Sequence, residues 1–544
     1  MNQPNLPSRP GELDFRDRAS LFRAAEERSF DLIIIGGGIT GAGIARAAAA
    51  RGLDVALVES RDLASGTSSR SSKMIHGGVR YLAQGDLALV REAATERQIL
   101  RRIAPHLARP MPFVLPTRSA GGLAKFRAAM WTFEKVGQVP KSDRHEAWSA
   151  RQLKEREPVA ALPGTNGAVR YWEFLTDDAR LTLANARSAS IDGALVLTHA
   201  PVVEILVEGD RAVGVRCEGS VAGESLSCVV RGKQIVNAAG PWVDAIRKVE
   251  QTSEESRLAL TKGIHLVVPH ARLPLAHTVL MNAADGRPIF GVPRGDVSYL
   301  GTTDTFYPSS DYWPGIEESD VDYLLDSAAK TFSSPALSAS DVVTSWTGIR
   351  PLVAQAGKKP SEISRKDEVW TGPKGVISIA GGKLTAYRAM AERVVDLVAE
   401  RLGQKTLDST AESSPLVGGD FTPEPYDGSS HDAAKPNRLL DLFGAEAADV
   451  LADGGDLDAE VRQAVCREGA LRLEDYWVRR SARAFFDLDA GMSQLEGASQ
   501  TMADLLGWSS ERRESEVAAC RKLHETNNAL FITARGESFA EDSK

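Results

Sequence analysis

The chain has 544 residues, so two or three domains are expected, because one domain commonly holds about 100 to 200 residues. Its hydrophobic fraction of 43% allows a sizeable core, and its net charge of −8 argues against a general nucleic-acid binder. No stretch approaches about eighteen uninterrupted apolar residues, so no membrane-spanning helix is expected.

The four cysteines lie far apart and form no C-x-x-C motif. This spacing is typical of a reducing compartment and argues against a disulfide redox centre or a cysteine-rich metal site, so no metal is expected. Residues 1–29 are polar, carry prolines such as Pro7 and Pro10, and lack the apolar core of a secretory signal. We interpret them as an N-terminal extension of a cytoplasmic protein, with peripheral membrane contact left open.

Residues 30–59 predict a strand, a glycine-rich turn, a helix and a second strand. The apolar run 32–35 is short and β-branched, as in a buried strand, and GGGITG at 36–41 fits G-x-G-x-x-G. An alanine-rich helix then covers 42–51, and a strand at 54–58 ends at Glu59. A bare glycine pattern is weak, but all the parts of a dinucleotide-binding unit stand here in order.

Each part of this unit has a physical task. Gly36 allows the tight turn, Gly38 lets the backbone approach a pyrophosphate, and Gly41 lets helix and strand pack closely. Ile39 and Thr40 lie in the turn directly before the helix, whose N-terminal N–H groups and dipole attract phosphate. Glu59 is placed to accept hydrogen bonds from ribose hydroxyls and argues against the 2′-phosphate of NADP. NAD and FAD both remain open at this point.

Residues 60–82 predict a second cofactor loop. Its first part is rich in serine, and MIHGGVRYL at its end is typical of a chain that turns back into the core; we call the segment the serine-rich loop. Small hydroxyl side chains and glycines suit the close approach of a phosphate or a flat ring system. The candidate cofactor residues of this loop are Ser68, Ser69, Ser72, Lys73, His76, Gly77 and Gly78.

Two helices are expected next, at 84–107 and 123–136. The second is amphipathic and carries aromatic residues, Trp131 among them, alongside three cations. A surface helix packed on the core is the favoured interpretation. The alternative is an interfacial helix whose aromatic residues lie at lipid headgroups while its cations meet anionic lipid.

Further along the chain, Asp177 and Asp178 precede a helix pattern and suit capping, so neither is a catalytic candidate. Strand signals fill 194–238, and the small residues that follow, at Ala239 and Gly240 before Trp242, suit a passage beside the cofactor. His265 lies on a predicted strand, where a histidine is more often a hydrogen-bonded core residue than a catalyst.

The last part of the chain contains a second strand–turn–helix pattern, followed by a linker and a helical region. VISIAGGKLTAY at 376–387 predicts a strand, a glycine turn and a helix whose start faces the cofactor. Residues 403–436 are rich in Gly, Pro, Ser and Asp and predict a linker, after which 437–544 forms a separate helical domain. The region 30–402 is expected to hold the cofactor domain with a substrate domain interleaved.

Eight motifs, in order, carry a family resemblance: TSSRSSKMIHGGVRYL, DDARLTLANA, VNAAGPWVD, KGIHLVVP, LGTTDT, TGIRPL, IAGGKLTAYR and DYWVRRSARAFF. Together they resemble the FAD-dependent glycerol-3-phosphate dehydrogenases, over roughly residues 30–510. The resemblance implies an α/β fold: a glutathione-reductase-type FAD-binding Rossmann-like domain interleaved with an antiparallel-sheet substrate domain, plus a C-terminal all-helical domain. FAD is the implied cofactor. Since no second G-x-G-x-x-G is present, no NAD(P)H site is expected. A homodimer is a family-level expectation only.

The resemblance also implies roles at the site. Arg80 and Arg350 would hold the substrate phosphate, as planar guanidinium groups can. His265 is the candidate general base, with His76 as the second choice. The other substrate candidates are Tyr81, Lys383 and Thr385. The remaining cofactor candidates are Ala239, Gly240, Trp242, Gly381, Gly382, Lys383 and Leu384.

Four functions stay open on the sequence. The leading one oxidises glycerol 3-phosphate with FAD and passes the electrons to a membrane quinone. An oxidase would use O₂ and release hydrogen peroxide; the absence of a mid-chain insertion found in many oxidases favours the dehydrogenase modestly. An amino-acid oxidase or dehydrogenase of the same fold could hold a carboxylate with the same arginines. A non-catalytic flavoprotein, with a scaffold role for the helical domain, is the last.

Overall fold

Strand β1 (Ser29–Ile35), helix α2 (Ile39–Ala50) and strand β2 (Val55–Val58) form the expected strand–helix–strand unit. The two strands are parallel, with Ile35 opposite Val58, and the side chains of Ile33 and Ile34 are fully buried. The computed structural model describes residues 12–77, 86–221, 223–250, 256–355, 357, 366–403, 405–422 and 438–536.

The first sheet is built around β1. Its strands run in the order β17-β18-β10-β1-β2-β7, and β9 and β8 extend it from β10 as an antiparallel pair. Because β7, β2, β1, β10 and β18 are parallel, their carboxyl ends meet at one edge. The remaining bounds are β7 Leu195–Leu197, β8 Val202–Glu208, β9 Arg211–Val221, β10 Glu224–Asn237, β17 Asp367–Thr371 and β18 Ile377–Gly381.

Helices cover both faces of this sheet. On one face α2 packs between α7 (Asp178–Ile191) and α10 (Tyr387–Leu402), and a Cβ at Gly43 would lie 2.8 Å from the Tyr387 ring. On the other face α1 (Arg18–Glu27) buries Phe22 against β9 and β10. Helix α8 (Val243–Glu250) follows β10.

The second sheet is mixed and mostly antiparallel, in the order β15-β11-β14-β13-β12-β4-β6-β3, with β16 on β11 and β5 on β6. Its strands are β3 Met74–Ile75, β4 Arg109–Thr117, β5 Glu146–Ser149, β6 Gly167–Leu175, β11 Leu258–Pro269, β12 Thr278–Asn282, β13 Pro288–Arg294, β14 Val297–Gly301, β15 Thr305–Phe306 and β16 Thr344–Val353. Its helices are α4 Leu87–Ile103, α5 Ala120–Val136, α6 Ala150–Arg156 and α9 Glu318–Ala329.

The two sheets are interleaved along the chain. After β1 and β2 the chain supplies β3 to β6 to the second sheet, returns for β7 to β10, leaves again for β11 to β16, and closes the first sheet with β17 and β18. Strand β3 comes directly from the serine-rich loop, so this loop joins the two sheets. The expected fold class is confirmed.

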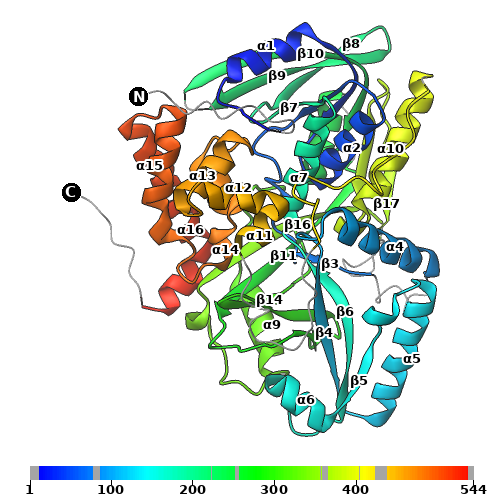
Figure 1. Ribbon diagram of the computed structural model, residues 1–544, viewed down its shortest axis with the longest axis vertical. Helices are drawn as coiled ribbons and strands as arrows, with labels where there is room; N and C mark the ends of the chain where they lie inside the picture. Colours follow the sequence, from blue (N-terminus) through cyan, green and yellow to red (C-terminus); the bar gives the residue numbers. More distant parts are fainter. Residues whose placement is uncertain are drawn as a thin grey trace.

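A helical region completes the fold, drawn in orange and red in Figure 1. It consists of α11 Arg438–Phe443, α12 Ala447–Ala452, α13 Leu457–Cys466, the π-helical turn η10 Asp475–Arg480, α14 Arg483–Phe486, α15 Leu495–Leu506 and α16 Ser510–Ala534. Its core is continuous with that of the second sheet, since the Trp346 ring lies 5.2 Å from Phe485. Among the described helices, none combines the length and the apolar character that crossing a bilayer requires.

Candidate active site

A cavity of about 370 Å³ lies where the parallel strands of the first sheet end. Ligands of open α/β sheets bind at such an edge. The cavity brings together predicted cofactor residues from four separate segments of the chain. Those lining it are Gly36, Gly38, Ile39, Thr40, Glu59, Ser68, Ala239, Gly240, Trp242, Gly381, Gly382, Lys383 and Leu384.

The glycine turn has no room for side chains. Gly36 has a φ of +112°, and a Cβ there would lie 2.6 Å from the carbonyl oxygen of Ala238. A Cβ at Gly41 would lie 1.9 Å from the Gly36 oxygen, so Gly41 serves the close packing of α2. The Ser68 hydroxyl accepts a hydrogen bond from the Ile39 N–H at 2.9 Å. The start of α2 lines the cavity, and the positive end of the helix dipole there can attract an anion.

Glu59 is held in place at the end of β2. Its Oε2 accepts from the Gly37 N–H at 2.6 Å, and its Oε1 accepts from the Arg61 N–H at 2.8 Å and from the Ser60 hydroxyl at 3.0 Å. The carboxylate is buried yet lines the cavity. It can still accept from a ribose hydroxyl, because two carboxylate oxygens offer about four lone-pair sites.

At the wall of the cavity, which Asp178 helps to line, a buried ion pair organises the serine-rich loop. Lys73, at a φ of +54°, directs its Nζ to Asp178 Oδ1 at 2.6 Å and to the Ser69 carbonyl at 2.8 Å. Asp178 Oδ2 accepts from the Ser71 N–H at 2.9 Å. Asp177 caps α7 as expected, accepting from the Arg180 N–H. The sequence analysis did not predict this role of Asp178. The sequence hint was that α7 needs only one capping acid, Asp177, so the second acid was free for another task.

One face of the ladder between β11 and β16 carries the candidate substrate residues. The register places His265 opposite Trp346, Gly263 opposite Gly348 and Thr261 opposite Arg350. Residues two apart share a face of a strand, so these three pairs stand in a row. The face packs on the serine-rich loop, because Trp346 Nε1 donates to the Ser71 carbonyl at 3.1 Å.

His265 is enclosed at one end of this row. Its ring stacks on Trp346 at 4.5 Å with an interplanar angle of 11°, and its Nε2 lies 2.8 Å from Ser72 Oγ. The side chain is 1% exposed. Burial, with the nearby charges of Arg350 and Lys73, lowers the pKa of the imidazole well below its ordinary value, so the ring is neutral at pH 7.

Arg350 stands at the other end of the row. Its Nη2 donates to Thr302 Oγ1 at 3.0 Å and its Nη1 to Asp304 Oδ1 at 3.2 Å. The guanidinium fits only because Gly263 has no side chain: a Cβ there would lie 2.4 Å from Nη2. Thr302 and Asp304 were not among the sequence candidates, although both belong to the LGTTDT motif.

The remaining candidates lie around the end of the serine-rich loop. Thr385 is buried and donates its hydroxyl to the His76 carbonyl at 3.2 Å. The Gly77 N–H donates to Glu173 Oε2 at 2.8 Å, and a Cβ at Gly77 would lie 2.7 Å from the Phe133 ring of α5. Gly78, Arg80 and Tyr81 lie outside the described residues.

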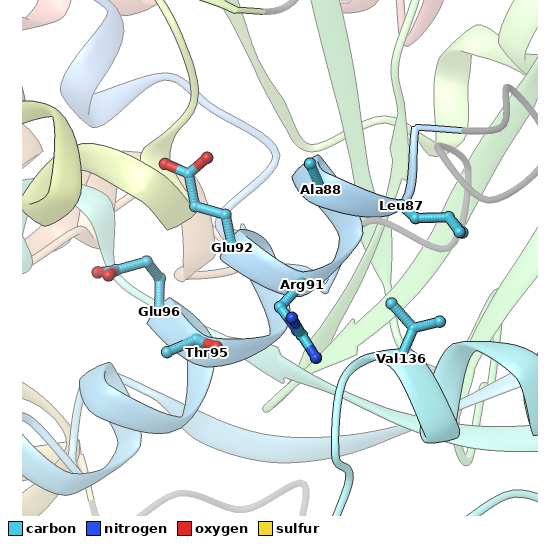
Figure 2. Close-up of a pocket in the computed structure, with 7 residues that line it drawn as sticks. All are labelled: Leu87, Ala88, Arg91, Glu92, Thr95, Glu96 and Val136. Carbon is cyan, nitrogen blue, oxygen red and sulfur yellow. The ribbon is translucent and has the colours of Figure 1, made fainter.

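A second hollow, which we call the α4–α5 groove, opens between these two helices (Figure 2). Its volume is about 600 Å³, and Leu87, Ala88, Arg91, Glu92, Thr95, Glu96 and Val136 line it. Two of its carboxylates are already paired with α10, Glu92 with Arg393 at 3.1 Å and Glu96 with Arg388 at 2.5 Å. It shares no residue with the sheet-edge cavity, which remains the candidate active site.

Family models and curated relatives cover most of the chain. Residues 31–388 match the family described as FAD dependent oxidoreductase, and 409–513 match the C-terminal domain of alpha-glycerophosphate oxidase. The aerobic glycerol-3-phosphate dehydrogenase of Staphylococcus saprophyticus is 35% identical over 529 residues, 92% of this chain and 95% of that protein. That of Bacillus subtilis is 35% identical over 538 residues, 93% and 97% of the two chains.

Solved structures agree in fold. The glycerol-3-phosphate dehydrogenase of Bacillus halodurans complexed with FAD is similar to 95% of this chain and 98% of its own, with a TM-score of 0.77 and 31% identity. The L-alpha-glycerophosphate oxidase of Mycoplasma pneumoniae with FAD bound has a TM-score of 0.54 at 16% identity over 72% of this chain. The second likeness is one of fold alone.

Proposed function

The chain belongs to the FAD-dependent glycerol-3-phosphate dehydrogenase family, and we propose that it oxidises sn-glycerol 3-phosphate to dihydroxyacetone phosphate and passes the electrons to a membrane quinone. FAD is its cofactor. The observation that carries the proposal is the row on β11 and β16, where a neutral histidine and an arginine face the loop that borders the FAD cavity.

The residues of the cavity fit FAD. The glycine turn and the start of α2 would hold the pyrophosphate, and the buried Glu59 carboxylate would receive the adenosine ribose. Ser68, Gly240, Gly381 and the other small residues of the wall leave room for a large flat ligand. When bound, FAD supplies the acceptor for the hydride.

The chain's own residues would prepare the substrate. The Arg350 guanidinium would bind the phosphate through two donors, with Arg80 as a second cation and Tyr81 and Thr385 as positioning contacts. Lys383 lines the cavity and would add positive charge beside substrate and cofactor. His265 would take the proton of the secondary hydroxyl, and the contacts around it would keep water away. His76 is the alternative base.

The quinone part of the proposal is supported by helix α5. Met130 and Phe133 point into the core and Phe126 is half-buried, so most of the apolar face serves packing. Trp131, however, is 59% exposed, with Lys135 5.7 Å from its ring centroid. Because Phe133 of α5 lies against Gly77, this helix packs directly on the serine-rich loop. We infer that the outer face of α5 rests on anionic lipid.

Replacing Trp131 by glutamate should lower binding to anionic vesicles at least severalfold, since the ring is lost from the interface and a negative charge is added. Co-sedimentation with phosphatidylglycerol vesicles at low salt measures this. Leu451→Glu, at a residue that is 57% exposed in the helical region, is the matched control and should bind as the unmodified protein does. Equal binding of the Trp131 variant would contradict the inference.

Anaerobic absorbance spectroscopy of the purified protein tests the function directly. Glycerol 3-phosphate should bleach the flavin band near ~450 nm, and a quinone analogue should restore it faster than air does. Rapid recovery in air with stoichiometric peroxide would instead make the protein an oxidase. If the flavin stays oxidised with glycerol 3-phosphate but is reduced by an amino acid, the substrate assignment is wrong. A flavin that no substrate reduces would point to a non-catalytic flavoprotein.

A further inference from the structure

The DYWVRR motif of the helical region forms η10, and all six of its side chains are buried. Two of them converge on Asp62, three residues after Glu59. Arg479 Nε donates to Asp62 Oδ2 at 2.5 Å, and Arg480 donates to both carboxylate oxygens, at 2.5 and 2.8 Å. Asp62 is fully buried. A carboxylate shared by two guanidinium groups in such a site is held rigidly in position.

The guanidinium groups are themselves fixed by other partners. Arg480 also donates to the Glu468 carbonyl through Nε at 3.1 Å and Nη2 at 2.8 Å. Arg479 Nη2 donates to Asp475 at 2.6 Å, and Nη1 donates to Glu474 at 2.9 Å. Every partner named here belongs to the helical region. Asp62, which belongs to the FAD-binding region, is therefore held by two arginines whose positions are fixed by the helical region.

The segment that contains Asp62 is in turn bonded to the glycine turn. The Asp62 carbonyl accepts from the Ser65 N–H at 3.2 Å, and the Ala64 N–H donates to the Gly37 carbonyl at 3.0 Å. At the same turn Glu59 accepts from the Gly37 N–H. The loop of residues 59–65 thus grips the turn through both backbone groups of Gly37, and its one fully buried carboxylate is the group that η10 holds.

Tyr312, from the loop between β15 and α9, strengthens the same connection. Its hydroxyl donates to Glu474 at 2.7 Å and accepts from Arg479 at 3.0 Å. Its ring lies 4.1 Å from the Arg61 guanidinium and 4.5 Å from that of Arg70, and both arginines belong to the serine-rich loop that follows Glu59. The helical region, the second sheet and the serine-rich loop meet at this side chain.

We propose that the helical region retains FAD: Asp62 is a positioning residue through which Arg479 and Arg480 hold the loop of Glu59 and the glycine turn in the cofactor-binding arrangement. The inference rests on the proposed placement of the adenosine half at Glu59. It gives the helical region a task that requires no contact with the cofactor. Linkage then requires the reverse effect as well, so bound FAD must stabilise the docking of η10.

The test is FAD affinity of Asp62→Asn, measured by flavin fluorescence when FAD is titrated into deflavinated protein. The dissociation constant should rise about tenfold or more, and saturating FAD should restore a normal rate of flavin reduction by glycerol 3-phosphate. The matched control is Glu446→Gln, which removes a carboxylate that binds Arg187 at 2.6 and 2.8 Å between the same two regions. Its FAD affinity should stay within about twofold.

Hydrogen exchange gives the second readout. In the unmodified protein, residues 475–480 should exchange faster without FAD than with it, and Asp62→Asn should lose this difference. If Asp62→Asn does not fold, Arg480→Lys keeps the charge but loses the paired donors, and it should show the same weakened affinity. Unchanged FAD affinity in the folded variant would overturn the proposal. Full affinity in Glu59→Ala would instead refute the placement of the adenosine half.

Discussion

Flavin reduction should slow by about 10²- to 10⁴-fold when His265 is replaced by asparagine, because this is the usual contribution of a positioned general base. Asparagine keeps a polar group near Ser72 Oγ, the present partner of the imidazole at 2.8 Å. Anaerobic stopped-flow mixing with saturating glycerol 3-phosphate measures the limiting rate. A near-normal rate would remove His265 from the base role and leave His76 as the candidate.

The role of His265 as a base also predicts how the limiting rate of flavin reduction changes with pH. The pKa of His265 is lowered by burial and by the charges of Arg350 and Lys73, so the imidazole stays neutral as the pH falls from 8 towards 6. The limiting rate of reduction should therefore be flat across that range and fall only at more acid pH, as the ring becomes protonated. In the asparagine variant this acid limb should disappear.

The loss must be separated from a general loss of stability. His277 is the matched control, since it is also a buried histidine next to the second sheet, with its Nδ1 2.9 Å from Glu157. His277→Asn should lower the melting temperature, because it disturbs a buried hydrogen bond, while the limiting rate of flavin reduction stays normal. If both variants slow reduction equally, the effect at His265 is structural.

The local patterns predicted cofactor segments that the structure brings together around one cavity. The glycine turn, Glu59 and the glycine pair at Gly381 all follow strands of the parallel sheet, and such strands end at one edge whatever the tertiary details. Apolar periodicity also predicted the α5 helix, but it gave no account of which side faces water. Only the packed structure shows that Phe133 is buried while Trp131 is exposed.

Pairings across long sequence separations lay beyond such patterns. Lys73 and Asp178 are 105 residues apart, and Asp62 and Arg479 are 417 apart. Seen alone in the sequence, Asp178 is explained as a helix-capping acid, and the other three residues as ordinary charged side chains. These residues meet because the two sheets are interleaved along the chain, which brings the ends of distant strands and η10 to the same loops. The row of His265 and Arg350 likewise depends on the register of β11 and β16.

Replacing Arg350 by methionine should raise the dissociation constant for glycerol 3-phosphate more than about 100-fold. Two charge-assisted hydrogen bonds are lost, each worth about 1.5–3 kcal/mol, and about 1.4 kcal/mol corresponds to a factor of ten. Lysine should recover part of the affinity, since it restores the charge but not the two-point geometry. The concentration dependence of flavin reduction under anaerobic conditions yields the constant.

A substrate without the phosphate identifies which interaction was removed. Glycerol should reduce the flavin of the unmodified protein poorly, and the methionine variant should be no worse with it, because no phosphate is present to be held. Arg272→Met, at a partly exposed arginine paired with Asp341 in the same region, is the control for losing a cation and should leave the constant unchanged. An equal loss of glycerol and glycerol 3-phosphate activity would mean that Arg350 maintains the local structure through Thr302 and Asp304, and that the phosphate binds elsewhere.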